Sequence, residues 1–117
     1  MRKPTRPETI FLNMYQDAID YEKRYEKRLQ ENGHVSHTML IRRSVYKERQ
    51  EQVIEAIEAI KNPRIRTIFF EKCVNGRSCC EIAKMLNLSP ATVSRYYYRS
   101  LDNIMVPEEV REKCQSH

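Results

Sequence analysis

The chain has 117 residues, with 21 Lys and Arg against 16 Asp and Glu, a formal net charge of +5, and two glycines. This length predicts one small domain, and the scarcity of glycine beside many helix-compatible residues argues against a β protein and for an all-α fold. No stretch has the length and hydrophobicity of a signal peptide or a membrane span, so we expect a cytoplasmic protein with reduced cysteines and no membrane partner.

The first part of the chain predicts a basic start and a long helix. Residues 1–7, MRKPTRP, hold three basic residues and two prolines, which suits a flexible segment or a DNA-contacting arm. A helix is expected over 8–32, with Asn32-Gly33 as its stop. Its apolar positions recur in steps of three and four: Phe11, Met14, Ala18, Tyr21, Tyr25 and Leu29. This stripe fits packing within the chain and the seam of a homodimer equally well.

A second helix is expected over 38–60, although its centre, KERQEQ, is polar. The pattern allows one continuous helix whose ends pack on different neighbours, or a break near residues 46–52. His34 and His37 lie in the linker before it, and without further ligands this pair does not predict a metal site.

A third helix is predicted over 63–75, because Asn62-Pro63 ends the preceding helix and Asn75-Gly76 provides the next stop. This is the most hydrophobic segment of the chain, and Ile68 and Phe69 lie on its apolar face. We expect it to be the central core helix.

The stretch 76–104 predicts two short helices joined by a tight turn. The first is expected over 79–86 after Ser78, Asn87-Leu88 forms the turn, and Ser89 caps a second helix over 90–104 that begins at Pro90. This order of parts is a helix-turn-helix, which presents its second helix to the DNA major groove. The side chains expected to face inward from the second helix are Val93, Tyr96 (or Tyr97), Ser100, Leu101 and Ile104.

Positive charge is concentrated around this stretch. Residues 61–106 carry eight Lys and Arg against three Asp and Glu, a net of +5, whereas residues 1–60 carry 11 against 10, a net of +1. A local excess of this kind is typical of a phosphate-binding face.

The outward face of the second helix supplies the candidate DNA contacts. Arg95 is the first choice for base reading, because its guanidinium matches the O6 and N7 atoms of guanine. The base-reading candidates are Ala91, Thr92, Ser94 and Arg95. The phosphate-binding candidates are Arg77, Ser78, Ser89, Tyr98 and Arg99. No residue spacing predicts a catalytic site, a cofactor site or a zinc site, so we do not expect an enzyme.

Residues 53–104 resemble region 4 of bacterial sigma-70-type factors. The matching features are VIEAIEAI, IRTIFFEKCVNG, Gly76-x-Ser78-x-x-Glu81-Ile82-Ala83, Leu86-x-Leu88-Ser89 and Thr92-Val93-Ser94. Nothing before residue 45 is similar to sigma region 2, and a free-standing region 4 behind a helical N-terminus is similar to small phage regulators of the ArpU and RinA type. The resemblance implies a phage or prophage transcriptional regulator that binds double-stranded DNA in the bacterial cell.

The chain departs from the family pattern at three places. Asn87 stands where glycine is common, Pro90-Ala91 stands where longer polar side chains often read bases, and three consecutive tyrosines follow Arg95. The domain organisation we expect is an N-terminal helical segment over 1–45, a sigma region 4-like domain over 46–106 and a flexible tail over 107–117.

Two other functions fit the same pattern. Region 4 folds also dock RNA polymerase, so the chain can be a protein-interaction module. Small terminase-like subunits of phage packaging machines likewise pair a helix-turn-helix with helical oligomerisation segments. The N-terminal helices can join two copies into a homodimer in any of these cases.

Overall fold

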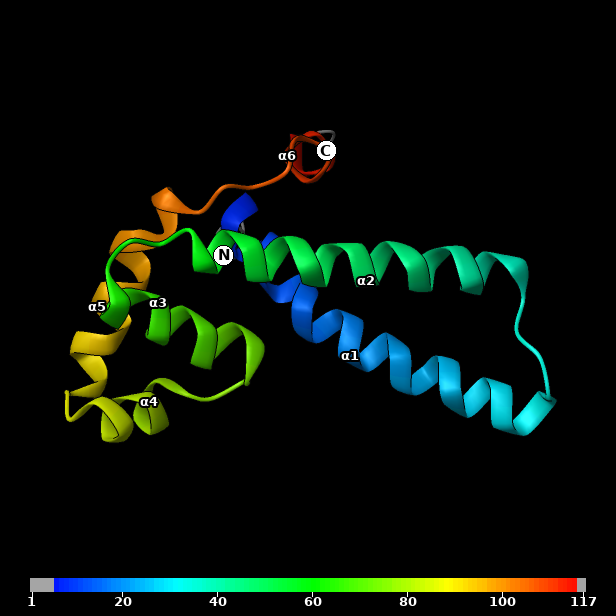
Figure 1. Ribbon diagram of the computed structural model, residues 1–117, viewed down its shortest axis with the longest axis horizontal. Helices are drawn as coiled ribbons and strands as arrows, with labels where there is room; N and C mark the ends of the chain where they lie inside the picture. Colours follow the sequence, from blue (N-terminus) through cyan, green and yellow to red (C-terminus); the bar gives the residue numbers. More distant parts are fainter. Residues whose placement is uncertain (1–5, 116–117) are drawn as a thin grey trace, which may run out of the picture.

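The computed structural model describes residues 6–115, which form six α-helices and no strand (Figure 1). The helices are α1 (Pro7–Asn32), α2 (His37–Glu58), α3 (Pro63–Phe69), α4 (Cys79–Leu86), α5 (Pro90–Ser100) and α6 (Glu108–Gln115). A π-helical segment, η1 (Phe70–Val74), continues α3, and a 3₁₀ turn, η2 (Leu101–Asn103), continues α5. The all-α expectation is therefore confirmed. Residues 1–5 of the basic start and residues 116–117 of the tail lie outside the described residues.

The ends of α1 and α2 follow from local chemistry. Gly33 adopts a φ of 74° after α1 and its N–H donates to the Leu29 carbonyl at 2.8 Å, which is the left-handed stop that glycine allows. Ser36 caps α2, because its hydroxyl accepts the Met39 N–H at 3.2 Å. The helix α2 then runs without interruption through residues 46–52, so the alternative of a break there is excluded.

Helices α1 and α2 form a long antiparallel hairpin whose tip projects from the rest of the molecule (Figure 1). Near the tip the two helices meet through rings and charges. The Tyr21 and Tyr46 rings lie 4.8 Å apart, and Arg43 lies over the Tyr25 ring at 4.7 Å while donating two hydrogen bonds to the Glu22 carboxylate at 2.7 and 2.9 Å. Tyr21 and Tyr25 of the α1 stripe thus pack on α2 of the same chain, whereas Leu29 at its end is 42% exposed.

The hydrophobic core lies at the other end of the hairpin, where every α-helix contributes to it. The largest fully buried side chains are Phe11, Leu12, Val53, Ile57, Ile68, Phe69, Ile82, Val93, Leu101, Ile104 and Val110. Burial of one such side chain contributes about 1.5–3 kcal/mol, so this cluster is the main source of stability. The expected boundary between residues 45 and 46 falls inside α2, and the first turns of α1 share one core with residues 53–110.

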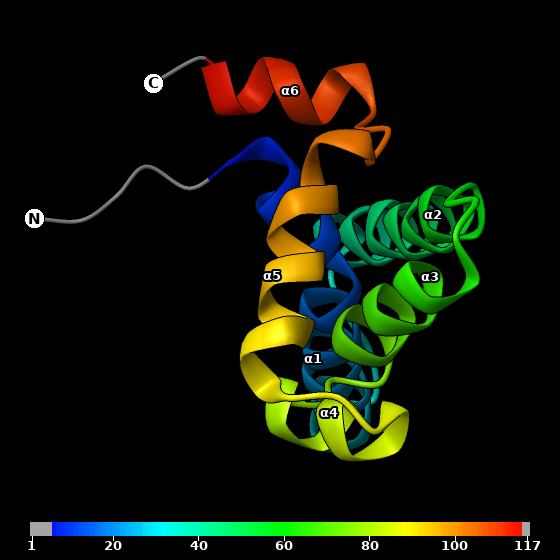
Figure 2. The ribbon, with the colours of Figure 1, turned by 90° about the vertical axis from the view of Figure 1, so that its left-hand side faces the viewer.

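The segment after Pro107 differs from the flexible tail expected there. It forms α6, and Val110 on this helix is only 1% exposed within the core. The Pro107 carbonyl accepts the N–H groups of Val110 and Arg111, and Glu108 and Glu109 place negative charge on the first turn, where the helix dipole favours it. Figure 2 shows α6 lying across the end of the molecule that holds the start of α1.

Candidate nucleic-acid interface

The two short helices α4 and α5, with the turn between them, are referred to below as the α4–α5 unit (Cys79–Ser100). It lies at the end of the molecule opposite the hairpin tip (Figures 1 and 2). The predicted turn is confirmed: Asn87 takes the left-handed conformation with φ 58°, and the Leu88 N–H donates to the Ala83 carbonyl at 2.8 Å. Ser89 caps α5 by accepting the Thr92 N–H at 3.1 Å, and Pro90 occupies the first helical position, where no N–H is needed.

The start of α4 is fixed by a capping box. The Ser78 hydroxyl accepts the Glu81 N–H at 3.2 Å, and the Glu81 carboxylate accepts the Ser78 N–H at 2.9 Å. This backbone hydrogen bond is the main reason that the pKa of Glu81 is lowered. Glu81 therefore acts as a capping residue of α4.

Helix α1 holds the segment that leads into α4. The π-helical turn η1 leaves carbonyl groups without helical partners, and Gln16 donates to those of Cys73 at 3.2 Å and Val74 at 2.8 Å. Gly76 follows with a φ of 69°, and a Cβ atom added at this position would lie 3.6 Å from the Gln16 side chain. The long N-terminal helix thus sets the position of the α4–α5 unit.

The inner face of α5 packs on α3 and η1. Tyr97 is 4% exposed; its ring lies 4.6 Å from Phe69 and its hydroxyl lies 4.0 Å from the Cys73 sulfur. Burial raises the pKa of Cys73 to about 11 and raises that of Tyr97 as well. Tyr97 is thus the main inward tyrosine, whereas Tyr96, expected on this face, is only half-buried.

The second helix also ends earlier than the expected residue 104, because α5 gives way to η2 after Ser100. Residues three apart lie above one another in a 3₁₀ turn. The tightening allows both Leu101 and Ile104 to enter the core.

The outer face of α5 presents one exposed row of the predicted contact residues. Ala91, Arg95, Tyr98 and Arg99 are all exposed, and Tyr98, at 60%, stands edge-on to the Tyr97 ring with centroids 5.3 Å apart. Among the described residues, neither Arg95 nor Arg99 has an acidic partner. Both guanidinium groups are available to a ligand in solvent.

The other candidates on α5 are less accessible. Thr92 and Ser94 are half-buried, and the Thr92 hydroxyl lies 2.7 Å from that of Ser89. The Ser89 hydroxyl also serves as the helix cap. Of the four base-reading candidates, the structure therefore leaves Ala91 and Arg95 exposed.

The two candidates before α4 are already engaged within the chain. The Ser78 hydroxyl is the α4 cap, and the Arg77 Nε donates to Glu71 at 2.9 Å. Asn75 donates to the same carboxylate oxygen at 2.8 Å. Glu71 was not singled out from the sequence, because the bend at Gly76 separates it from Arg77 and no helical spacing joins the two.

The N-terminal segment is tied to the end of α5. Arg6 forms an ion pair with Asp102 and lies 3.3 Å from Glu8, whose carboxylate also lies 3.4 Å from Arg111 of α6. These ion pairs join positions up to 103 residues apart, so no sequence spacing could indicate them. Through them the start of α1 is held against η2 and α6.

Searches with protein-family models, of curated proteins and of solved structures found no match to this chain. None of the helices in residues 6–115 is long and apolar enough to cross a membrane.

Proposed function

We propose that the protein is a sequence-specific regulator of transcription that binds double-stranded DNA. In this proposal the α4–α5 unit is a helix-turn-helix of the sigma region 4-like kind, and α5 enters the major groove. The observation that carries the proposal is the exposed row Ala91, Arg95, Tyr98 and Arg99 on a short, capped helix, whose two arginines have no acidic partner within residues 6–115. The resemblance to phage regulators adds the expectation that the genes controlled belong to a phage or prophage.

The dimensions of α5 suit this role. Its 11 residues span about 16 Å, and the major groove of B-DNA, about 12 Å wide, admits one α-helix. The absence of long side chains at Pro90 and Ala91 lets the start of the helix approach the bases closely. A positive net charge of +5 over residues 61–106 favours the approach to the phosphate backbone.

Each exposed residue then has a distinct role. Arg95 binds a guanine edge with its two-pronged guanidinium group, and Ala91 contacts a thymine methyl group. Arg99 and Tyr98, one turn further on, bind phosphates. Ser89 and Thr92 hold the start of α5 in place, and these two and the half-buried Ser94 contribute less to base reading.

The proposal is tested by selecting bound duplexes from a random pool and measuring their affinity over a range of salt concentrations. For Arg95→Ala we expect the preference for the selected duplex over random duplex to fall by about 1–3 kcal/mol. For Arg99→Ala we expect weaker binding to all duplexes and a salt dependence reduced by about one unit of slope.

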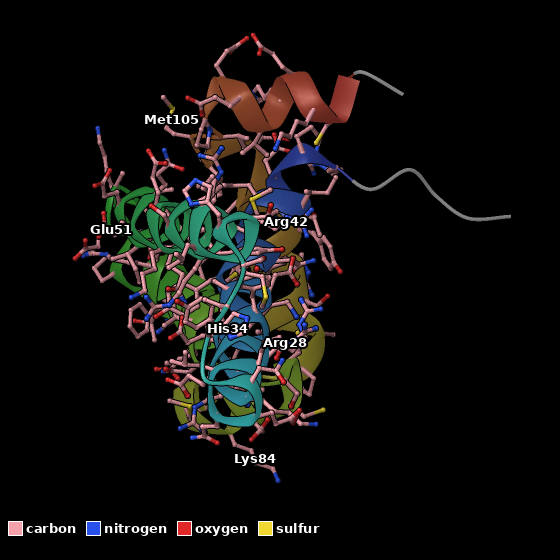
Figure 3. The ribbon with its side chains drawn as sticks, turned by 90° about the vertical axis from the view of Figure 1, so that its right-hand side faces the viewer. Arg28, His34, Arg42, Glu51, Lys84 and Met105 are labelled. Atoms are coloured by element: carbon pink, nitrogen blue, oxygen red, sulfur yellow. The ribbon has the colours of Figure 1, made fainter. Side chains whose placement is uncertain are left out.

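Arg28→Ala is the matched control, since it removes the same exposed charge from α1 near the hairpin tip (Figure 3). It should leave the preference unchanged. If the wild type bound every duplex with the same affinity, and Arg95→Ala did not alter that affinity, base reading by α5 would be excluded.

A further inference from the structure

A groove runs along the hairpin on the side covered by α6, far from the exposed row of α5. It encloses about 440 Å³ between α1, α2 and the end of α6. Its lining includes the apolar side chains of Ile41 and Val45 and the guanidinium groups of Arg24, Arg42 and Arg49. The α1 wall extends from Met14 to Arg24, which corresponds to about 15 Å or three helical turns.

The apolar part of this groove is open because α2 turns its polar side inward near the tip. Arg43 and Tyr46 of α2 face α1, where they contact Glu22 and Tyr21. Ile41 and Val45 are instead 52% and 40% exposed. A surface helix normally buries its apolar residues and exposes its charges, so this first half of α2 is arranged for a further contact.

The charged part of the groove is strongly basic. Four of its lining residues are Arg or Lys and one, Asp17, is acidic. Arg49 already pairs with Glu109 of α6 at 3.6 Å, and Arg24 lies over the Tyr21 ring at 5.3 Å. Arg42 is exposed and has no acidic partner among the described residues.

We propose that this groove docks an acidic amphipathic helix of a protein partner. Its apolar side chains would lie on Ile41 and Val45, and its carboxylates would pair with Arg24 and Arg42. The combination of an apolar floor with basic edges favours this occupant over nucleic acid, whose phosphates gain nothing from aliphatic side chains. An amphipathic helix in a hydrophobic groove is a common mode of recognition, and three turns match the length of the groove.

The site is separate from the DNA-reading face proposed above. The groove extends from the middle of the hairpin toward its tip, whereas the α4–α5 unit lies at the end of the molecule away from the tip (Figure 1). The partner and DNA can therefore bind at the same time, and this docking function stands or falls independently of DNA binding.

The test uses the full chain and fluorescence anisotropy of a labelled synthetic helix of about 15 residues, long enough to form several turns. The probe carries leucines at every third and fourth position and glutamates elsewhere. One comparison peptide has the same composition in shuffled order, and another has lysines in place of the glutamates. We expect the ordered acidic probe to bind in preference to both.

Substitutions in the groove are compared with matched substitutions outside it. Arg42→Glu and Ile41→Asp should each weaken probe binding about tenfold or more. Lys84→Glu on α4 and Met105→Asp before α6 make the same chemical changes at exposed positions away from Arg42 (Figure 3) and should have no such effect. Circular dichroism verifies that each variant is folded, and Arg42→Glu should also gain affinity for the lysine peptide.

Three results would overturn the proposal. The first is that the chain binds the ordered and shuffled peptides with equal affinity, or that Arg42→Glu and Ile41→Asp both bind the acidic probe as tightly as the wild type does. The second is self-association of the chain, detected by sedimentation and abolished by Ile41→Asp, without binding of the probe; a second copy would then cover the groove. The third is loss of duplex DNA binding in Arg42→Glu without any binding of the probe.

Discussion

At one end of the molecule, α3, α4 and α5 pack aliphatic and aromatic side chains that are fully buried, whereas near the hairpin tip α1 and α2 meet through tyrosine rings and an ion pair. The buried end fixes the orientation of α5, because Tyr97 fits between Phe69 and Cys73. The tip instead leaves Leu40, Ile41 and Val45 in solvent. In the proposals above, the tightly packed end presents α5 to DNA, and the tip offers its exposed apolar side chains to a protein partner.

The largest difference in stability between the two regions should appear when one aromatic ring is removed from each. Phe69→Ala removes a fully buried side chain beneath α5 and should lower the free energy of unfolding by about 3–5 kcal/mol. Tyr46→Ala near the tip removes a half-buried ring and should cost clearly less. Urea unfolding measures both. Equal losses would mean that the hairpin tip is as tightly integrated as the core.

A smaller difference in the loss of stability is expected between alanine substitutions at the two glycines with positive φ. Gly76→Ala forces a left-handed alanine beside Gln16 and should cost about 1–2 kcal/mol of stability. Gly33→Ala also places an alanine in the left-handed region, at the hairpin tip. Apart from the residues next to it in the chain, however, no atom lies within 4 Å of the added Cβ. The tip can relax by local fraying, so the Gly33 variant should lose less. A larger loss for Gly33→Ala in thermal unfolding would contradict this account.

The smallest effect on stability should come from removing the ion pair between Arg43 and Glu22 near the tip. The hydrogen bonds from Arg43 are the main cause of the lowered pKa of Glu22. Since the folded-state pKa lies below the ordinary value of 4.5, the stabilisation is fully present above that pH and is lost as the pH falls through the folded-state pKa.

Glu22→Gln should therefore lower the melting temperature slightly at neutral pH and not at all in strong acid. Added salt should reduce the difference at neutral pH, because the pair is partly exposed. A difference that persisted unchanged in strong acid would show that Glu22 contributes through packing.

The parts of this fold that could be predicted from sequence are those set by neighbouring residues. Asn32-Gly33, Ser78, Asn87 and Ser89-Pro90 mark helix ends through backbone conformation and capping, and each lies where it was expected. Which of Tyr96 and Tyr97 faces the core could not be predicted in this way, because the answer depends on the position of Phe69 on another helix. Local periodicity cannot determine it.

Long-range contacts explain the remaining differences. The packing of α6 depends on Val110 meeting a core that is assembled from α1 and η2, and on Arg111 meeting Glu8. The engagement of Arg77 by Glu71 depends on the bend at Gly76. Such contacts form only after the chain has folded, so they could not be inferred from spacing.

The central claim is that α5 is the DNA-reading element of this protein. Its most direct test is to record the backbone amide NMR signals of the isotope-labelled chain while the selected duplex is added. We expect the largest changes at residues 91–99, with little change at residues 22–45 of the hairpin tip. Changes confined to the hairpin tip, with the signals of residues 91–99 unaltered, would contradict the account.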